Sequence, residues 1–437
     1  PINPKTITTI IIIYFIAVIV HFVSYTNKNW LRIDVFFILG YTIVHLQWPI
    51  MYAFSNIIPD NYWRIFVDDK VVNYTTWVSV FGGVLFLLGF NLSKKRNISK
   101  KIIPKFYYKR LLYFTVFSFL IFLAFAGKDF LSGSVYKGNG GSTAGDGISK
   151  YFALFYQIGL TVLTAIIIYQ NKDKYNGNLI RWFLGLDKVY LLLIIFYILI
   201  FLTIGDRGGP LSIILTILIL VGSFVKIFKL YEVVLLTLIG GLLMTVIGLG
   251  RSEASGLDIL TTGVDKYSGG INYDSTLELA NSYRTLNTAI AHVPEEHDYF
   301  YGSLWMANIL SPIPFAQSLY IDITDFKSYE LGSATYITYL VYGENPSSGE
   351  GTSIIADIYL NFGVIGIMFF MFVLGVFLRK LSMELINPSN IKWIVIAAIF
   401  AGIALYYSRA SYLMSLRSVI WSLIFLSLFV KVSKRKV

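Results

Sequence analysis

The stretch Val189–Val225 reads VYLLLIIFYILIFLTIGDRGGPLSIILTILILVGSFV, and its only charged residues are Asp206 and Arg207. An uncharged, mostly apolar run of 16 residues lies on each side of the central turn, Val189–Ile204 before it and Pro210–Val225 after it. As an α-helix, each run covers most of the hydrocarbon core of a bilayer, which is about 30 Å thick. Helices are expected because the bilayer offers no water to pair with an open strand edge. The stretch therefore predicts two membrane-spanning helices joined by a short polar turn.

The same pattern recurs along the whole chain. Nine further apolar runs are long enough to span: Ile7–Val23, Ile33–Phe54, Tyr74–Leu92, Leu111–Ala126, Tyr151–Tyr169, Tyr231–Leu249, Ser353–Leu378, Ile391–Tyr407 and Tyr412–Val430. The composition agrees, because 56% of the residues are hydrophobic and only 14% are charged, whereas soluble domains carry about 25% charged residues. We predict an all-α fold, a polytopic transmembrane helix bundle of about eleven spans. The chain has no cysteine, which excludes disulfides and thiolate metal sites.

The basic residues predict how the bundle is oriented. The net charge is +11, and Lys94–Arg110 holds eight Lys and Arg residues and no acid between two apolar runs. Cytoplasmic loops are enriched in such residues, so we expect this cluster inside, facing anionic lipid rather than nucleic acid. Alternation then puts four further segments inside: Asn171–Lys188, Lys226–Lys229, Arg379–Asn390 and the tail Lys431–Lys436. With eleven spans, the N-terminus is expected outside.

Two long segments fall on the predicted outer side. Gly127–Lys150 is rich in glycine and is expected to be a mobile loop. Arg251–Thr352 has 102 residues, with 13 of the chain's 25 acids and four basic residues, and a loop of this length is typical of a folded, functional cap. Within it, Thr276–Ala291 and Ser303–Leu310 are expected to form short helices, and Ser311–Pro314 is expected to end the second.

These features predict three parts along the chain. They are residues 1–249 with transmembrane helices 1–8 and the basic cytoplasmic loop 94–110, residues 250–352 with the large, partly helical external loop, and residues 353–437 with transmembrane helices 9–11 and the basic cytoplasmic tail.

Arginines at several places on the predicted outer side are the candidate binding residues. Arg207 lies in the turn between two spans, Arg251 follows Tyr231–Leu249, and Arg409 and Arg417 flank the last hairpin. An arginine within the membrane boundary, as Arg417 is predicted to be, costs about 2.5 to 3.5 kcal/mol on insertion scales. A guanidinium donates several charge-assisted hydrogen bonds to phosphate oxygens without deprotonating. We predict that these arginines converge on a diphosphate and stabilise its charge as it leaves.

Three more polar residues complete the predicted substrate-binding set: Asp206, Glu253 and Arg284. Asp206 is expected to orient or partly neutralise Arg207, and the neighbouring glycines are expected to open backbone N–H groups towards a ligand. Two of the arginines also have a purely structural interpretation. Arg207 suits a short turn whose side chain reaches the membrane interface, and Arg417 suits a salt bridge within the bundle.

Glu350 is the candidate general base. It lies in the glycine-rich segment before Ser353–Leu378, where partial screening from water favours proton acceptance. The alternative interpretation is charge complementarity, because anions are favoured at helix N-termini. Arg207 and Arg251 join Glu350 as the predicted catalytic residues. His292 and His297 are expected to be solvated, so we predict no metal site and no cofactor.

The chain resembles the Wzy-type O-antigen polymerases, within the GT-C-like membrane glycosyltransferases. The likeness rests on Gly205-Asp206-Arg207-Gly208-Gly209, Gly250-Arg251-Ser252, Ser311-Pro312-Ile313-Pro314 and Gly349-Glu350-Gly351-Thr352-Ser353. It implies metal-independent inverting transfer, in which an undecaprenyl-diphosphate-linked glycan donates its chain to a hydroxyl of a second lipid-linked repeat and undecaprenyl diphosphate leaves. Related O-antigen ligases carry a histidine near the start of the helix after the large loop, and this sequence has none there.

The resemblance also implies a location and partners. The location is the bacterial inner membrane, with the active site facing the periplasm. The implied partners are lipid-linked oligosaccharides, membrane lipids and a polysaccharide chain-length regulator. Three alternatives remain: an O-antigen ligase, a lipid-linked glycan flippase or exporter, and a structural partner of a chain-length regulator. A flippase is expected to hold its charge deep in a symmetric central cavity, and a structural partner does not need Arg417 within a span.

Overall fold

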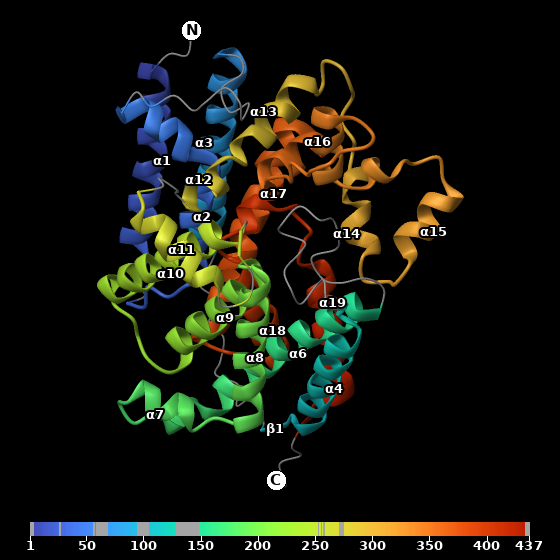
Figure 1. The fold of residues 1–437 in the computed structure, drawn as a ribbon. Helices are drawn as coiled ribbons and strands as arrows, with labels where there is room; N and C mark the ends of the chain where they lie inside the picture. Colours follow the sequence, from blue (N-terminus) through green and yellow to red (C-terminus); the bar gives the residue numbers. More distant parts are fainter. Residues whose placement is uncertain are drawn as a thin grey trace.

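The chain folds almost entirely into helices (Figure 1). This computed structural model describes residues 4–25, 28–55, 57, 69–93, 105–127, 148–251, 253–254, 256, 258–270 and 275–432. Two short strands, β1 (Phe106–Tyr107) and β2 (Lys431–Val432), pair antiparallel. The predicted loops Lys94–Arg110 and Gly127–Lys150 and the tail after Val432 lie largely outside the described residues.

Each of the eleven predicted spans coincides with a helix. These helices are α1 (Pro4–Ser24), α2 (Ile33–Ser55), α3 (Asp69–Leu92), α4 (Lys109–Phe125), α6 (Ile148–Asn171), α8 (Lys188–Ile204), α9 (Gly208–Phe224), α10 (Leu230–Gly250), α17 (Ile354–Ile386), α18 (Ile391–Ile403) and α19 (Leu416–Phe429). Of the helices in the described part, six are long and apolar enough to cross a membrane: α1, α2, α3, α6, α10 and α17. The all-α polytopic membrane fold is confirmed, and the number of spans stays a prediction.

The remaining short helices lie in the connections. They are η3 (Lys172–Lys174), α7 (Leu179–Leu184), α11 (Asp258–Ser268), α12 (Ser275–Ala280), α13 (Tyr283–His292), η4 (Ser303–Trp305), α14 (Met306–Leu310), α15 (Ala316–Ile323), η5 (Ser328–Leu331), α16 (Ser333–Tyr342) and η6 (Tyr407–Arg409). The expected helix at Thr276–Ala291 is therefore two helices, because the chain turns at Asn281 and Ser282. The second expected helix does end at Leu310. The helices α11, α15 and α16 had no counterpart in the sequence prediction.

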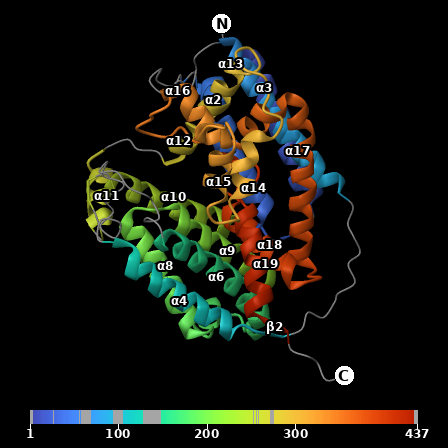
Figure 2. The same ribbon diagram turned by 90° about the vertical axis from the view of Figure 1, so that its right-hand side faces the viewer.

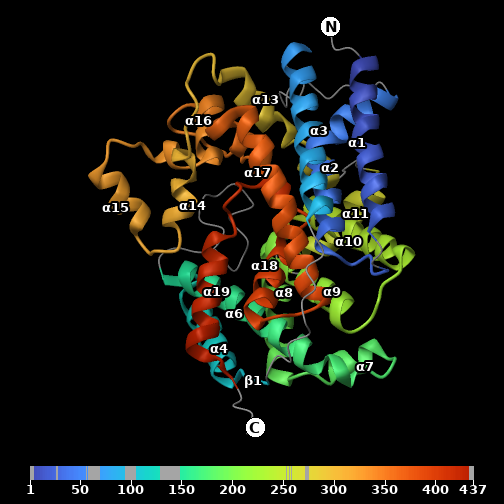
Figure 3. The same cartoon turned by 180° about the vertical axis from the view of Figure 1, so that it is seen from behind.

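Close backbone contact holds α17 against α3. A Cβ atom on Gly375 would lie 2.1 Å from the carbonyl oxygen of Phe86, and one on Gly89 would lie 2.1 Å from that of Phe372. Small residues permit such an approach between helices in a membrane protein. Figures 2 and 3 show α3 and α17 running side by side, and Figure 3 shows α1 and α2 next to α3. α17 and α18 also contact α9, and α9 in turn packs against α6.

One buried carboxylate ties the large loop to this framework. Asp357 of α17 is fully buried and accepts hydrogen bonds from Trp305 Nε1 in the loop at 2.7 Å and from the backbone N–H of Tyr412 at 2.8 Å. Tyr412 belongs to the connection between α18 and α19, which also holds Arg409. The loop and this connection are thus fixed to the same point of α17.

The first and last described elements of the chain lie at opposite ends of the bundle. α1 begins at the end where α13 and α16 lie, and α19 runs down to β2, beside β1 and α7, at the other end (Figure 1). The prediction that the N- and C-termini lie on opposite sides of the membrane requires them to be at opposite ends of the bundle. Which end faces outwards stays a prediction.

Cysteine labelling tests that orientation. The chain has no native cysteine, and Lys174 and Asp298 are both exposed, at opposite ends of the predicted topology. In intact cells we expect a membrane-impermeant maleimide to label a single cysteine at Asp298 and not one at Lys174, which should react only after permeabilisation. Equal labelling of both in intact cells would contradict the orientation.

Candidate functional site

The turn between α8 and α9 is shaped by glycine and Asp206. Gly205 adopts a φ of 93° and ends α8, a conformation that glycine tolerates best. The carboxylate of Asp206 accepts the backbone N–H of Gly208 at 2.9 Å and that of Gly209 at 3.4 Å. The expectation that these N–H groups open towards a ligand is therefore wrong, because Asp206 occupies them. Burial raises the pKa of Asp206, while these N–H bonds and the charges of Arg251 and Arg207 oppose that rise.

Arg207 reaches out of this turn to two other segments. Its Nη1 donates to the carbonyl oxygen of Met244 in α10 at 3.1 Å, and its Nη2 lies 2.6 Å from Glu278 Oε2 in α12. Arg251 follows the last turn of α10, and its Nη2 lies 3.3 Å from Glu278 Oε1. The side chains of Arg207, Arg251 and Glu278 are 14%, 25% and 33% exposed, so they are reachable from solvent. Two guanidiniums thus hold the two oxygens of one carboxylate.

Arg409 brings a third guanidinium to this place. It lies in η6, between α18 and α19, and is partly buried. Burial lowers the pKa of Arg409, the charge of Glu278 raises it, and the charges of Arg284, Arg207 and Arg251 lower it further. Arg409 is therefore within electrostatic range of Glu278 and of the other three arginines. We call Arg207, Arg251, Arg284, Arg409 and Glu278 the arginine cluster.

Arg284 links the arginine cluster to Glu350. It lies in the first turn of α13, and its guanidinium forms an ion pair with the carboxylate of Glu350. The side chain of Glu350 is 5% exposed, its Oε1 accepts a hydrogen bond from Tyr342 Oη at 2.6 Å, and its backbone N–H donates to Thr338 Oγ1 at 3.0 Å. Hydrogen bonding to Glu350 raises the pKa of Tyr342. Glu350 is therefore a buried, firmly held carboxylate at the edge of the arginine cluster.

The structure does not bring two of the predicted residues to the arginine cluster. Glu253 forms an ion pair with Lys266 at 2.5 Å, and its side chain is 62% exposed. Arg417 is exposed near the start of α19 and interacts electrostatically with Tyr151 of α6. Of the predicted arginines, Arg207 and Arg251 meet at Glu278, and Arg409 is within electrostatic range of both and of Arg284. Their convergence on a diphosphate stays a prediction. The roles of Glu253 and Arg417 in binding stay predictions.

Glu278 and Tyr342 were missed by the sequence analysis. Glu278 lies at the start of a predicted helix, where a lone acid suits the helix terminus and gives no functional signal. Arg207 and Glu278 are 71 residues apart in the sequence, so only the tertiary fold brings them into contact. His292 Nε2 lies 3.8 Å from Glu296, and no group of three His, Asp or Glu side chains that could hold a metal ion occurs in the described part.

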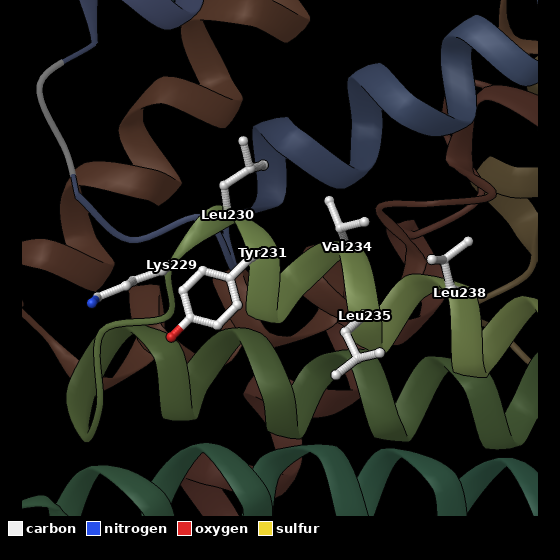
Figure 4. A pocket seen from close by; sticks show the side chains of 6 residues that line it. All are labelled: Lys229, Leu230, Tyr231, Val234, Leu235 and Leu238. Carbon is white, nitrogen blue, oxygen red and sulfur yellow. The ribbon is translucent and has the colours of Figure 1, made fainter.

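A shallow groove among the described residues lies apart from these charges. It runs along the exposed side of α10 and is lined by Lys229, Leu230, Tyr231, Val234, Leu235 and Leu238 (Figure 4). Apolar side chains with a lysine and a tyrosine at one end are typical of a lipid-facing helix and its anchors at the membrane interface. This groove shares no residue with the arginine cluster, so we assign it to the lipid-facing surface.

Comparison with known proteins gives one match, which covers almost the whole chain. The model of the family described as O-antigen polysaccharide polymerase Wzy matches residues 2–436. The comparisons with curated proteins and with solved structures gave no match. The family match and the apolar helices agree on a multi-pass membrane protein of polysaccharide biosynthesis. The chain therefore belongs to the Wzy family of O-antigen polysaccharide polymerases, which join lipid-linked sugar repeats.

Proposed function

We propose that this chain joins undecaprenyl-diphosphate-linked oligosaccharide repeats on the outer side of the inner membrane by inverting glycosyl transfer. One observation supports the site: Arg207 and Arg251 hold both oxygens of the Glu278 carboxylate, and two further arginines lie near. A carboxylate presents the same kind of paired anionic oxygens as a phosphate group. Glu278 then occupies the place where the diphosphate of the donor lipid binds.

The proposed chemistry follows from the charges around that place. The bond between the anomeric carbon and the diphosphate oxygen breaks, and its electron pair stays on undecaprenyl diphosphate. An acceptor hydroxyl forms the new glycosidic bond from the opposite face and loses its proton to a base. The guanidiniums stabilise the charge that develops on the leaving diphosphate, and their fixed positions orient the donor.

Glu350 is the proposed base. It is buried next to Arg284, and a carboxylate can assist a hydroxyl nucleophile by accepting its proton during bond formation. Tyr342 and Arg284 hold both of its oxygens in the structure. We therefore propose that substrate binding draws Arg284 towards the diphosphate and frees one oxygen of Glu350 for the acceptor hydroxyl.

Purified protein supplied with a defined lipid-diphosphate oligosaccharide tests the proposed function. We expect a ladder of products that differ by one repeat, with one undecaprenyl diphosphate released for each bond formed. Transfer only to a lipid A-core acceptor, without a ladder, would favour the ligase. Movement of the lipid-linked repeat across a vesicle membrane without any new bond would favour the flippase.

Glu278 gives a prediction about binding. Because its carboxylate competes with the diphosphate for Arg207 and Arg251, Glu278→Gln is expected to tighten the binding of undecaprenyl diphosphate about threefold to tenfold. This is the scale of a partly exposed ion pair. The affinity is measured by titrating the purified variant with the lipid. Glu344→Gln, which removes an exposed carboxylate that pairs with Lys327 and lies outside the predicted binding set, serves as the control and should leave the affinity unchanged. Weaker binding in the Glu278 variant would instead make Glu278 a residue that holds the arginines in place.

A further inference from the structure

A second group of buried charges lies at the other end of α9 from the arginine cluster. The connection between α1 and α2 packs there against the segment between α9 and α10. Trp30 N–H donates to the carbonyl oxygen of Phe228 at 3.0 Å, and Phe228 N–H donates to Asn29 Oδ1 at 3.1 Å. In the predicted topology this is the cytoplasmic end of the bundle.

A single carboxylate at this place is already fully engaged. Asp34 is buried and accepts from Arg32 Nε at 3.1 Å and from Arg32 Nη2 at 2.8 Å. His21 Nε2 lies 3.1 Å from Asp34 Oδ2, and His21 Nδ1 lies 3.1 Å from Asn91 Oδ1. Arg32 therefore neutralises the charge of Asp34, and His21 takes a further contact with it.

Arg379 of α17 brings a second guanidinium to the same place. Its Cζ lies 4.5 Å from the ring centre of Tyr25, and the Cζ of Arg32 lies 4.2 Å from the same ring centre. Arg379 is 6% exposed, and within the described residues its buried Nε and Nη1 have no hydrogen-bond partner and it forms no ion pair. Two adjoining stretches lie outside the described residues, 26–27 and 94–104. They contain no Asp or Glu, so they offer no counter-charge.

We propose that Arg379 and Arg32 form a binding site for a phosphate-bearing anion at this end of the bundle. A buried charge without a partner is unfavourable, so a cation held this way needs an anion from outside the chain. The guanidinium fork matches phosphate oxygens, and Tyr25 holds both guanidiniums by cation–π contact. A phospholipid headgroup and free phosphate share this chemistry. The site is separate from the arginine cluster and does not depend on the proposed reaction.

Thermal unfolding of the full chain in a neutral detergent, after removal of bound lipid, tests the site. The probes are phosphatidylglycerol, phosphatidylcholine, and inorganic phosphate against chloride at equal ionic strength. We expect phosphatidylglycerol, and not phosphatidylcholine, to raise the unfolding midpoint in a saturable way. Arg379→Gln is expected to need at least about tenfold more phosphatidylglycerol for half of the effect, which corresponds to the loss of a charged hydrogen bond. A rise with inorganic phosphate alone that Arg379→Gln abolishes would support the site and identify free phosphate as the ligand.

Lys380→Gln is the matched control, because it removes the same charge at the next residue. Lys380 is exposed and lies over the ring of Trp393, with 3.4 Å from Nζ to the ring centre. Its response should equal that of the unchanged protein. The proposal is overturned if the unchanged protein shows no saturable response to phosphatidylglycerol or to inorganic phosphate. It is also overturned if the Arg379→Gln protein responds like the unchanged protein. The first of these results needs no variant, so the test holds even if Arg379→Gln does not fold.

Discussion

Arg207→Gln is expected to slow chain growth by about 10²- to 10³-fold while the protein still folds and enters the membrane. Removal of one fixed donor that stabilises a developing anion has an effect of this size in other enzymes. Arg207 is only 14% exposed and donates both to Met244 and to Glu278, so its position is fixed before substrate binds. Arg207→Lys keeps the charge but loses the forked guanidinium that can bind two oxygens at once. We therefore expect the rate of chain growth to fall about ten- to a hundredfold. The measurement is the initial rate of ladder formation by purified protein.

Two other arginines complete this experiment. Arg181 of α7 is exposed at the opposite end of the bundle, so Arg181→Gln controls for the general loss of a positive charge and should keep the parent rate. Arg417 lies outside the arginine cluster, so Arg417→Gln should cost less than Arg207→Gln. A rate near that of the parent in the Arg207→Gln protein would rule out the proposed diphosphate site.

Glu350→Gln is expected to lower the maximal rate of chain growth about 10²-fold or more, the usual scale for loss of a general base. Glutamine keeps the size and most of the hydrogen bonding to Tyr342 and Arg284, so the change isolates proton acceptance. The Michaelis constant for the lipid-linked repeat should change little. The acidic limb of the pH–rate profile should also disappear, because that limb reports protonation of the base.

Glu344 provides the matched control for Glu350. It lies six residues earlier, is exposed and pairs with Lys327 at 3.2 Å, so Glu344→Gln should preserve both the rate and the pH profile. If Glu350→Gln alters only the Michaelis constant, Glu350 positions Arg284 and the sugar. If it keeps the parent rate and pH profile, the base lies elsewhere in the loop.

The fold could be predicted from the sequence because each spanning helix is encoded locally. Apolar runs such as Val189–Ile204 and Pro210–Val225 must be helical wherever they cross a bilayer. The residues of Gly205–Pro210 likewise predicted a turn, and Gly205 adopts the left-handed conformation there. Arg207, Arg251 and Arg409 could be proposed together because charged residues at the end of a span are few and costly.

The contacts within the site could not be predicted in the same way. Glu278 meets Arg207 and Arg251 only because α12 packs against α2 and α10, and no periodic pattern in the loop encodes that packing. The link from Asp357 to Trp305 and Tyr412 spans three segments and depends on the position of the loop over α17. Arg409 and Arg417 are only eight residues apart, yet they face different surroundings, because Arg409 lies in the connection before α19 and Arg417 lies in the first turn of α19.

The affinity for undecaprenyl diphosphate shows directly whether the arginine cluster binds the donor diphosphate. Purified protein is titrated with this lipid and with undecaprenyl monophosphate, and the unchanged chain is compared with the double variant Arg207→Gln/Arg251→Gln and with Arg181→Gln. We expect the unchanged chain to prefer the diphosphate. We also expect the double variant to bind it at least about a hundredfold more weakly, since each charged hydrogen bond contributes roughly 1.5 to 3 kcal/mol. Equal binding of the diphosphate by the double variant and the unchanged chain would show that Arg207 and Arg251 do not bind it.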